Sequence, residues 1–203
     1  MILCLRRRKT SRPLTSPLQL ETARLKLRSL EDRDRADFAA MNADLAVMRY
    51  FAAPLTREES DEAVDRYTRQ LERDGFSFLA TESREDGEFL GILGMQVMRV
   101  AVPNLPQPAI EVGWRLKCTA QGKGFATEGA RALVDHAFQT LDLPEIVAIT
   151  VPDNTGSRHV MEKLGMVHRA ELMFEHPLVP AGHRYRQHVL YSLKNPKEVS
   201  CSV

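Results

Sequence analysis

The sequence is poor in cysteine and contains no long apolar run. Its three cysteines, Cys4, Cys118 and Cys201, lie far apart, so they form neither a disulfide framework nor a zinc-site spacing. A reducing cytoplasm is therefore the expected compartment. No apolar run reaches the roughly 18 residues that would span a bilayer, so no membrane partner is expected.

Metal-binding patterns are also absent from the sequence. The chain has six histidines but no His-Glu-x-x-His motif. His183 and His188 are an odd number of residues apart, so they would face opposite ways along a strand. No metal cofactor is predicted.

The charge is nearly balanced overall but unevenly distributed. Net charge is +1, yet residues 1–18 hold five cations and no acid, which leaves −4 for the remainder. We interpret residues 1–18 as a flexible basic tail, 19–195 as one domain and 196–203 as a loose tail. The mildly acidic body has no nucleic-acid footprint, so no nucleic-acid partner is expected.

Hydrophobic periodicity and breaker residues predict alternating strands and helices. The predicted strands are Leu25–Leu30, Phe76–Thr81, Phe89–Val100, Ala109–Leu116, Glu145–Thr150 and a final pair within residues 166–193 joined through His176–Gly182. The predicted helices are Asp32–Met41 capped by Ser29, a helix from the capping box Thr56-x-x-Glu59 to near Gly75, one after Gly124, and one capped by Asn154 and ended by Gly165.

This order predicts the class of fold. Antiparallel strands early in the chain and a later strand–helix–strand crossover give an α/β (α+β) fold with a mixed, mostly antiparallel central sheet flanked by helices. Within the second long strand, Gly91 and Gly94 predict a bulge or a close backbone contact.

The most informative stretch is the glycine-rich turn Gln121–Thr127, which lies between a strand and an amphipathic helix. Gly122 and Gly124 allow a sharp turn, and the helix N-terminus offers unpaired N–H groups and partial positive charge. The turn predicts a phosphate-bearing ligand, with a plain tight turn as the alternative. It is not a P-loop, and Thr127 stands where a dinucleotide fingerprint needs a third Gly or Ala.

Three motifs in order resemble the GNAT superfamily of acetyl-CoA-dependent N-acetyltransferases. Gln121-x-x-Gly124-x-Ala126 resembles its cofactor signature, and Asn154–Met166 resembles its second conserved block. Leu20–Arg28 resembles the opening of the ribosomal-protein N-terminal acetyltransferase (RimJ/RimL-like) branch. The resemblance covers residues from about 20 to 193, since the motifs lie in the expected order along that part of the chain. It implies a GNAT fold with a β-α-β unit, and acetyl-CoA as the acetyl donor.

The implied activity is acetyl transfer to a primary amine by direct attack in a ternary complex. The acceptor is a protein N-terminus or a small amine or amino-acid-like molecule, and the protein acts as a monomer or homodimer. Two other interpretations stay open. One is a non-catalytic acyl-CoA-binding regulatory or interaction module. The other is a nucleotide- or NAD-binding enzyme, against which the missing third Gly and the late position of Asp153 argue.

The resemblance also implies which residues hold the cofactor. The Val112–Cys118 backbone, including Leu116, Lys117 and Cys118, would hold the pantetheine arm, and Asn154 matches the residue that bonds this arm. The pyrophosphate would be bound by Gln121, Gly122, Lys123, Gly124, Phe125, Ala126 and Thr127. Arg158 and Lys163 either meet CoA phosphates or are solvated helix cations. Direct transfer needs no nucleophilic cysteine, so Cys118 is interpreted as structural.

Glu111 is the predicted general base. Acetyl transfer requires a neutral amine, a polarised thioester carbonyl and a proton for the leaving thiolate. Glu111 and Arg115 share one face of their strand by alternation. A carboxylate in an apolar strand is costly without a function or a partner, and an ion pair with Arg115 is the alternative interpretation. A raised pKa would let Glu111 accept the amine proton.

The acid and the acceptor contacts are less clearly marked in the sequence. Met161 stands where many GNAT enzymes carry a tyrosine. Ser157 would then orient a water or protonate the thiolate, unless it is only part of the helix start or proximity alone carries the rate. Tyr50 and Phe51 are either candidate substrate contacts or ordinary core aromatics. Glu111 is a further candidate substrate contact. His176 and His188 either line the acceptor pocket or are surface or core residues.

Overall fold

The computed structural model describes residues 18–199. The predicted basic tail therefore lies outside the described residues except for Leu18, which is 8% exposed and packs into the main core. Residues 200–203 also lie outside. No helix among residues 18–199 is long and apolar enough to cross a membrane.

The described chain alternates strands and helices as expected. In chain order the elements are β1 (Leu20–Glu21), β2 (Leu25–Arg28), the 3-10 turn η1 (Asp32–Asp34), α1 (Arg35–Ala43), α2 (Arg57–Asp74), β3 (Phe78–Ser83), β4 (Phe89–Val97), β5 (Ile110–Leu116), η2 (Cys118–Ala120), α3 (Phe125–Gln139), β6 (Glu145–Thr150), α4 (Thr155–Lys163), β7 (Val167–His168), η3 (Ala170–Leu172), β8 (Phe174–Glu175), β9 (Gln187–Lys194) and α5 (Pro196–Val199).

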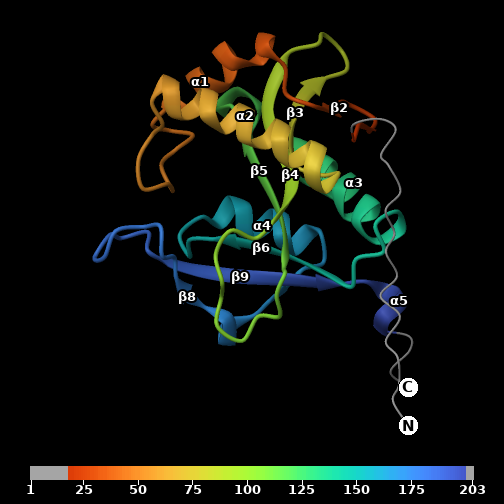
Figure 1. Cartoon of the computed structure of the whole chain (residues 1–203), viewed down its shortest axis with the longest axis vertical. Helices are drawn as coiled ribbons and strands as arrows, with labels where there is room; N and C mark the ends of the chain where they lie inside the picture. Colours follow the sequence, from red (N-terminus) through yellow and green to blue (C-terminus); the bar gives the residue numbers. More distant parts are fainter. Residues whose placement is uncertain (1–17, 200–203) are drawn as a thin grey trace.

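The strands form one mixed sheet that divides at its single parallel junction. The order is β1-β2-β3-β4-β5-β6-β9-β7, and β8 pairs with β9. All neighbouring pairs are antiparallel except β5 and β6, which are paired at one register position only, Glu111 opposite Val147. In Figure 1, β3, β4 and β5 fill the upper half of the molecule while β6 and β9 cross the lower half. One long edge of β5 therefore has no strand partner beyond Glu111.

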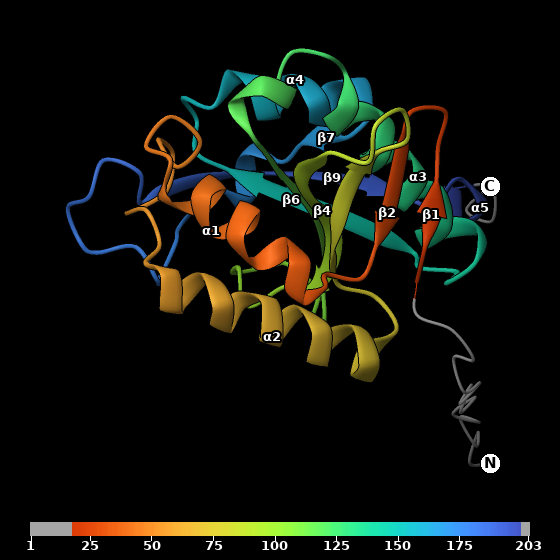
Figure 2. The ribbon, with the colours of Figure 1, turned by 90° about the horizontal axis from the view of Figure 1, so that it is seen from above.

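Helices cover both faces of the sheet. Figure 2 shows α1 and α2 on one side of β2–β4 and α4 on the opposite side. The face under α3 and α4 holds the largest core cluster, which includes Leu133, Val134 and Phe138 of α3. The α1–α2 face holds a second cluster around Phe38 and Tyr67. A third cluster lies under the β4–β5 connection, where Met98, Val100 and Val102 pack against β6 and β9.

Both predicted features of the glycines in β4 are confirmed. Gly91 has φ 144°, and the register between β3 and β4 shifts beside it, between Thr81 and Glu82. A side chain at Gly91 would put its Cβ 2.3 Å from the Arg115 carbonyl oxygen. A Cβ at Gly94 would meet the Phe78 Cα at 2.3 Å, so this position is a close backbone approach.

The predicted helix caps are mostly confirmed. The Thr56 hydroxyl accepts from Glu59 N at 3.2 Å and Glu59 Oε2 accepts from Thr56 N at 2.8 Å, which completes the capping box of α2. Gly75 ends that helix with φ 80°. The prediction that Ser29 caps the first helix is wrong. The chain enters through η1, whose N-cap is Glu31, and Asp34 Oδ2 accepts from Glu31 N at 2.8 Å.

The C-terminal region is less regular than a simple pair of long strands. β8 has two residues and pairs with the start of β9. Tyr185, expected within the last strand, lies in the turn before β9. Asn195 is 3% exposed and donates from Nδ2 to Leu143 O at 3.0 Å. Residues 196–199, expected to belong to a loose tail, form the short helix α5.

Candidate active site

The glycine-rich turn has the backbone geometry that its sequence predicts. Gly122 and Gly124 adopt φ 74° and 84°, and Gly124 is the N-cap of α3. The first bond of the helix runs from Glu128 N to Gly124 O at 3.0 Å, so the N–H groups before it have no intrahelical acceptor. Gln121 Nε2 donates to Leu116 O at 3.0 Å and ties the turn to the end of β5. The turn therefore presents backbone donors beside the unpaired edge of β5.

A cation that sequence reasoning missed supports this turn. Arg24 donates from Nε to Glu128 Oε2 at 2.7 Å and from Nη1 to Lys123 O at 3.0 Å, and its guanidinium lies 4.6 Å over the Phe125 ring. Thr22 Oγ1 also donates to Glu128 at 2.6 Å. These contacts join the start of the chain to the first turn of α3. Arg24 lies in the Leu20–Arg28 motif, but the sequence does not show that its partner is 104 positions away.

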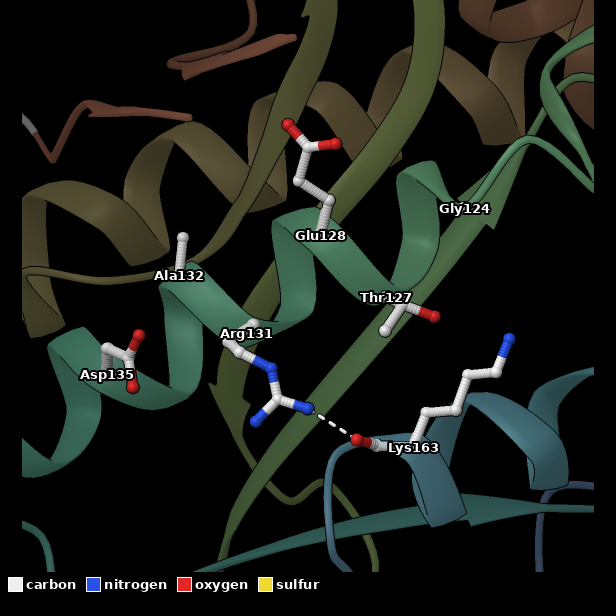
Figure 3. Close-up of a pocket in the computed structure, with 7 residues that line it drawn as sticks. All are labelled: Gly124, Thr127, Glu128, Arg131, Ala132, Asp135 and Lys163. Atoms are coloured by element: carbon white, nitrogen blue, oxygen red, sulfur yellow. Dashed lines mark hydrogen bonds between the residues drawn. The ribbon is translucent and has the colours of Figure 1, made fainter. Parts of the chain in front are cut away.

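A hollow of about 520 Å³ lies beside the start of α3 and the end of α4 (Figure 3). It is lined by Gly124, Thr127, Glu128, Arg131, Ala132, Asp135 and Lys163. Arg131 donates to the Lys163 carbonyl oxygen and so joins the two helices. In Figure 3 the Lys163 side chain extends alongside Thr127. Arg131 is a second cation that the sequence motifs did not single out, since it is simply one residue on the exposed side of a helix.

Lys117 and Cys118 are two further residues that were predicted to contact the cofactor. Lys117 Nζ lies 3.0 Å from Asp37 Oδ1, so its ammonium group is already paired, and its backbone N–H donates to Leu90 O while its carbonyl accepts from Ala120 N, each at 2.9 Å. Cys118 is exposed as a residue, but partial desolvation of its thiol and the neighbouring Asp44 raise the pKa of that thiol. A raised pKa keeps the thiol protonated, which agrees with the structural interpretation of this residue.

Ser157 is held by two donors at the start of α4. Asn154 caps the helix by accepting from Ser157 N at 3.2 Å, and its Nδ2 donates to Ser157 Oγ at 3.1 Å. Trp114 of β5 donates from Nε1 to the same oxygen at 3.3 Å. A hydroxyl oxygen has two lone pairs, so both are occupied and the proton of Ser157 remains to be donated elsewhere. The predicted cap at Asn154 is confirmed.

Glu111 lies at the position where β5 and β6 begin to diverge. It pairs in register with Gln96 of β4, whose Nε2 donates to Glu111 Oε2 at 3.1 Å. No cation forms an ion pair with Glu111 among residues 18–199. Burial raises the pKa of Glu111 above its ordinary value, while the Gln96 hydrogen bond and the charge of Arg99 offset part of that rise. The carboxylate is thus a stronger proton acceptor than an exposed one.

Arg115 does not pair with Glu111, which removes the alternative interpretation of that carboxylate. Arg115 instead donates from Nη1 to Asn42 Oδ1 of α1, and its guanidinium lies 4.3 Å from the centre of the Phe51 ring. Phe51 is 42% exposed, so it is not an ordinary core aromatic. It stands beside a strand face that also carries Glu111.

Two loops meet at this face. Tyr50, in the α1–α2 loop, makes an edge contact with Tyr185 of the β8–β9 loop at 5.8 Å between ring centres. Figures 1 and 2 show both loops projecting from the same side of the molecule. His176 and His188 stand 4.8 Å apart at the base of the second loop, and burial lowers the pKa of both. Because these loops are separate in sequence, only the fold brings their aromatic residues together.

The position at which many family members carry a tyrosine offers no proton here. Met161 is 2% exposed and belongs to the main core. No group of three or more histidine, cysteine or acidic side chains in the described part of the chain is placed to hold a metal ion.

The comparisons with known proteins agree with this arrangement. The family described as "Acetyltransferase (GNAT) domain" matches residues 24–167, more than half of the chain. The uncharacterized protein YkkB of Bacillus subtilis (strain 168) is 31% identical over 75% of this chain and 87% of its own length. Spermidine N(1)-acetyltransferase of Escherichia coli (strain K12) is 30% identical over 74% of this chain and 77% of its own length.

The fold has close structural neighbours as well. The crystal structure of a GNAT-family acetyltransferase from Bacillus anthracis superposes with a TM-score of 0.73 over 88% of this chain and 99% of that one, at 23% identity. A mixed sheet that opens beside a glycine-rich helix N-terminus suits a phosphate-bearing cofactor. The chain belongs to the GNAT family of acetyltransferases, and it is an enzyme of the N-acetyltransferase class.

Proposed function

We propose that this enzyme moves the acetyl group of acetyl-CoA directly to a primary amine within a ternary complex. The observation that carries the proposal is the opening between β5 and β6. It has Glu111 at its closed end and the glycine-rich turn beyond its open end, with Ser157 held to β5 through Trp114. One thioester in this opening would lie between a proton acceptor and a proton donor.

The cofactor path follows from the unpaired groups. The edge of β5 from Val112 to Leu116 offers backbone donors and acceptors to the amide groups of pantetheine, as a missing strand would use them. The N–H groups of Gly122–Thr127 receive the pyrophosphate at the positive end of α3. The side chains of Lys163 and Arg131 line the hollow beside that turn and supply positive charge for further phosphate oxygens. Asn154 acts here by placing Ser157, since both its side-chain atoms are bonded within the protein.

Glu111 is the proposed base. Burial moves the pKa of Glu111 toward neutral pH. A base with such a pKa is strong enough to take a proton and is still ionised at the working pH. It removes a proton from the ammonium form of the acceptor, directly or through one water, so that the neutral amine attacks the thioester carbonyl. The C–N bond forms and the C–S bond breaks. The second proton that the nitrogen must lose passes to the leaving sulfur, so that CoA departs as the thiol.

Ser157 is the proposed donor to the leaving thiolate. Its oxygen already accepts from Trp114 and Asn154, which fixes the free direction of its proton. A hydroxyl held in this way stabilises a developing negative charge without reorganising in the transition state.

The acceptor is proposed to be a protein N-terminus or a small amine, bound between the α1–α2 and β8–β9 loops with Tyr50 and Phe51 as contacts. The run Leu20–Arg28 supports a RimJ/RimL-like branch, and a reducing cytoplasm suits the scattered cysteines. The name of the Escherichia coli relative supports small amines as the other substrate class to be tested.

The test combines binding and turnover. A thermal-shift titration compares acetyl-CoA, NADH and ATP, because a ligand at ~100 times its Kd adds ~2.7 kcal/mol of stability. Thiol release is then followed with a panel of peptides and amines. We expect a melting shift with acetyl-CoA that NADH and ATP do not match, and amine-dependent thiol release. Binding without release from any amine would instead favour the non-catalytic module, and no shift with acetyl-CoA would overturn the proposal.

A further inference from the structure

Arg115 is a partly buried cation whose charge the protein leaves without a counter-ion. Its Nη1 donates to the side-chain oxygen of Asn42, a neutral and fully buried amide. Its Nε is buried and has no hydrogen-bond partner. No carboxylate forms an ion pair with it among residues 18–199. Leaving a buried charged donor unpaired is costly, so an absent partner is expected to complete this site.

The unpaired side of Arg115 has the shape that carboxylates and phosphates match. Nε and Nη2 form one edge of the guanidinium plane and bind two oxygens, or one shared oxygen, of an anion side-on. The same chain uses this edge elsewhere. Arg28 donates from Nε and Nη2 to Glu82 Oε2 at 2.9 and 2.7 Å, and Arg73 donates from the same two atoms to Asp74. In Arg115 the Nε atom of this edge is buried without a hydrogen-bond partner, and the side-chain hydrogen bond that the guanidinium makes to a described residue comes from Nη1, off this edge.

A second arginine points to the same conclusion. Arg66, on α2, also has a buried Nε without a hydrogen-bond partner, and it forms no ion pair with a described residue. Arg66 lies 4.9 Å over the Tyr67 ring. Burial lowers the pKa of Arg115, the charge of Tyr67 offsets part of that fall, and the charge of Arg66 adds to it. An anion bound to Arg115 would also be attracted by the charge of Arg66.

Arg115 lies on the acceptor side of the sheet. Arg115 and Glu111 project from the same face of β5, and the exposed Phe51 ring covers Arg115. We propose that Arg115, assisted by Arg66, binds an anionic group of the amine acceptor, a carboxylate or a phosphate. The acceptor is therefore an amine that carries a negative charge away from its reacting nitrogen. This inference rests on the proposed function and narrows its substrate class.

The spacing along β5 also sets a length for the acceptor. A strand rises ~3.3 Å per residue, so the Cα atoms of Glu111 and Arg115 are ~13 Å apart. Even with both side chains leaning inward, several bonds must separate the amine from the anion. Glycine is thus too short, whereas a longer ω-amino acid, an amino phosphate or a peptide with an acidic side chain near its N-terminus fits.

The experiment measures kcat/KM for matched acceptor pairs at saturating acetyl-CoA. The pairs are ω-amino acids from glycine to 6-aminohexanoate against their amides, O-phosphoethanolamine against ethanolamine, and Ala-Glu peptides against Ala-Gln peptides, with spermidine as a cationic acceptor. In the pairs long enough to span the site, which excludes glycine and its amide, we expect the anionic member to be preferred by about 10–100-fold, the size expected for charge-assisted hydrogen bonds. The preferred pair identifies the source of the anion.

Variants separate binding of the anion from a structural role. Arg115→Gln can keep a hydrogen bond to Asn42, and Arg115→Lys keeps the charge but loses the two-atom edge. Both are expected to reduce the preference to within about 2-fold while neutral amines are still acetylated, as expected when a charge-assisted contact is removed. Arg66→Gln should reduce the preference partly. Arg73→Gln, on the same helix but exposed and paired with Asp74, should leave it unchanged.

Equal use of anionic and neutral acceptors by the unaltered enzyme would overturn the inference, as would a uniform loss in Arg115→Gln for all acceptors. If no amine in the panel is acetylated, the proposed function fails while this site is still tested. The CoA-saturated protein is then titrated with sodium phosphate against sodium chloride at equal ionic strength. A phosphate-specific rise in Tm that Arg115→Gln abolishes supports the site, and an equal or absent rise overturns it.

Discussion

At the scale of single residues, the burial and hydrogen bonding of Glu111 lead to two predictions for Glu111→Gln, one on the rate and one on the stability. Glu111→Gln removes the proposed base but keeps an oxygen that can accept from Gln96, so the strand is preserved. We expect kcat/KM to fall by about 10²–10⁴-fold, the usual contribution of a general base. The acidic limb of the pH profile should disappear with it. An unchanged rate across pH would exclude Glu111 as the base.

The same variant has an opposite effect on stability. The raised pKa means that the folded state holds the Glu111 proton more tightly than the unfolded chain. The contribution of Glu111 to the free energy of unfolding is therefore fully present below its pKa in the unfolded chain. It is lost as pH rises through its pKa in the folded protein. Glu111→Gln should be as stable as the unaltered enzyme at low pH and more stable at neutral pH, measured by urea unfolding. A destabilised variant at neutral pH would show that the carboxylate has a partner that compensates its burial.

Ser157 offers a separate prediction about the leaving thiolate. Ser157→Ala should lower kcat by about 10²-fold or more, at the lower end for an acid catalyst, with the KM for acetyl-CoA little changed. It also leaves the donors of Trp114 and Asn154 unpaired, so some stability is lost. Ser157→Thr keeps the hydroxyl and should recover most of the rate. If both variants lose stability but neither loses rate, Ser157 is only part of the helix cap.

At the scale of elements, a substitution in the glycine-rich turn can distinguish the effect of backbone strain from the effect of a lost ligand contact. Gly124→Ala places a side chain at φ 84°, which costs about 1–2 kcal/mol. Its Cβ would also stand 3.4 Å from Arg24 Nη2, at the mouth of the turn. The KM for acetyl-CoA should rise about tenfold if the bound state loses a further 1.4 kcal/mol.

The control for this variant is Gly87→Ala in the β3–β4 hairpin. Gly87 has φ 75°, and a Cβ there meets nothing within 4 Å. It should lose similar stability in thermal unfolding but leave the KM for acetyl-CoA unchanged. Matching increases in KM for both variants would mean that strain alone, and no contact at the turn, explains the effect.

Elements were predictable from sequence where their signals are local. The capping box at Thr56, the cap at Asn154 and the bulge at Gly91 depend on neighbouring residues and are confirmed. The cap at Ser29 was predicted wrongly because side-chain contacts of Asp34, which no short motif marks, decide where the turn begins. Buried Arg28 takes both oxygens of Asp34 at 2.7 and 2.9 Å, which fixes the chain so that Glu31 precedes the first turn.

The site shows the same division at the scale of the whole molecule. The turn Gln121–Thr127 is a contiguous motif and was recognised, but Arg24, Arg131 and Asn42 were not. Each reaches the site through a contact to a distant segment, as in the Arg24–Glu128 pair 104 positions apart. A single sequence shows which residues alternate on a strand, but it does not show which loops meet over that strand. The proximity of Tyr50 and Tyr185 is of this second kind.

The last prediction concerns the sparse pairing between the two halves of the sheet. β5 is paired along its whole length with β4, yet with β6 only at Glu111 and Val147. Acetyl-CoA bound in the opening would fill the missing pairing and join the halves. A ligand that binds only the folded state disfavours every local opening that exposes its site. At ~100 times its Kd, it raises the free energy of such an opening by ~2.7 kcal/mol.

Amide hydrogen exchange with and without acetyl-CoA tests this directly. Protection should increase in two segments above all, the second half of β5 and the turn at Gln121–Thr127. It should stay unchanged in α2, whose backbone bonds lie on the opposite face of the sheet. The unaltered segment is the internal control within the same spectrum. Uniform protection across the described chain would indicate a general gain in stability without a localised cofactor path, and protection confined to α1 and α2 would place the cofactor on the wrong face.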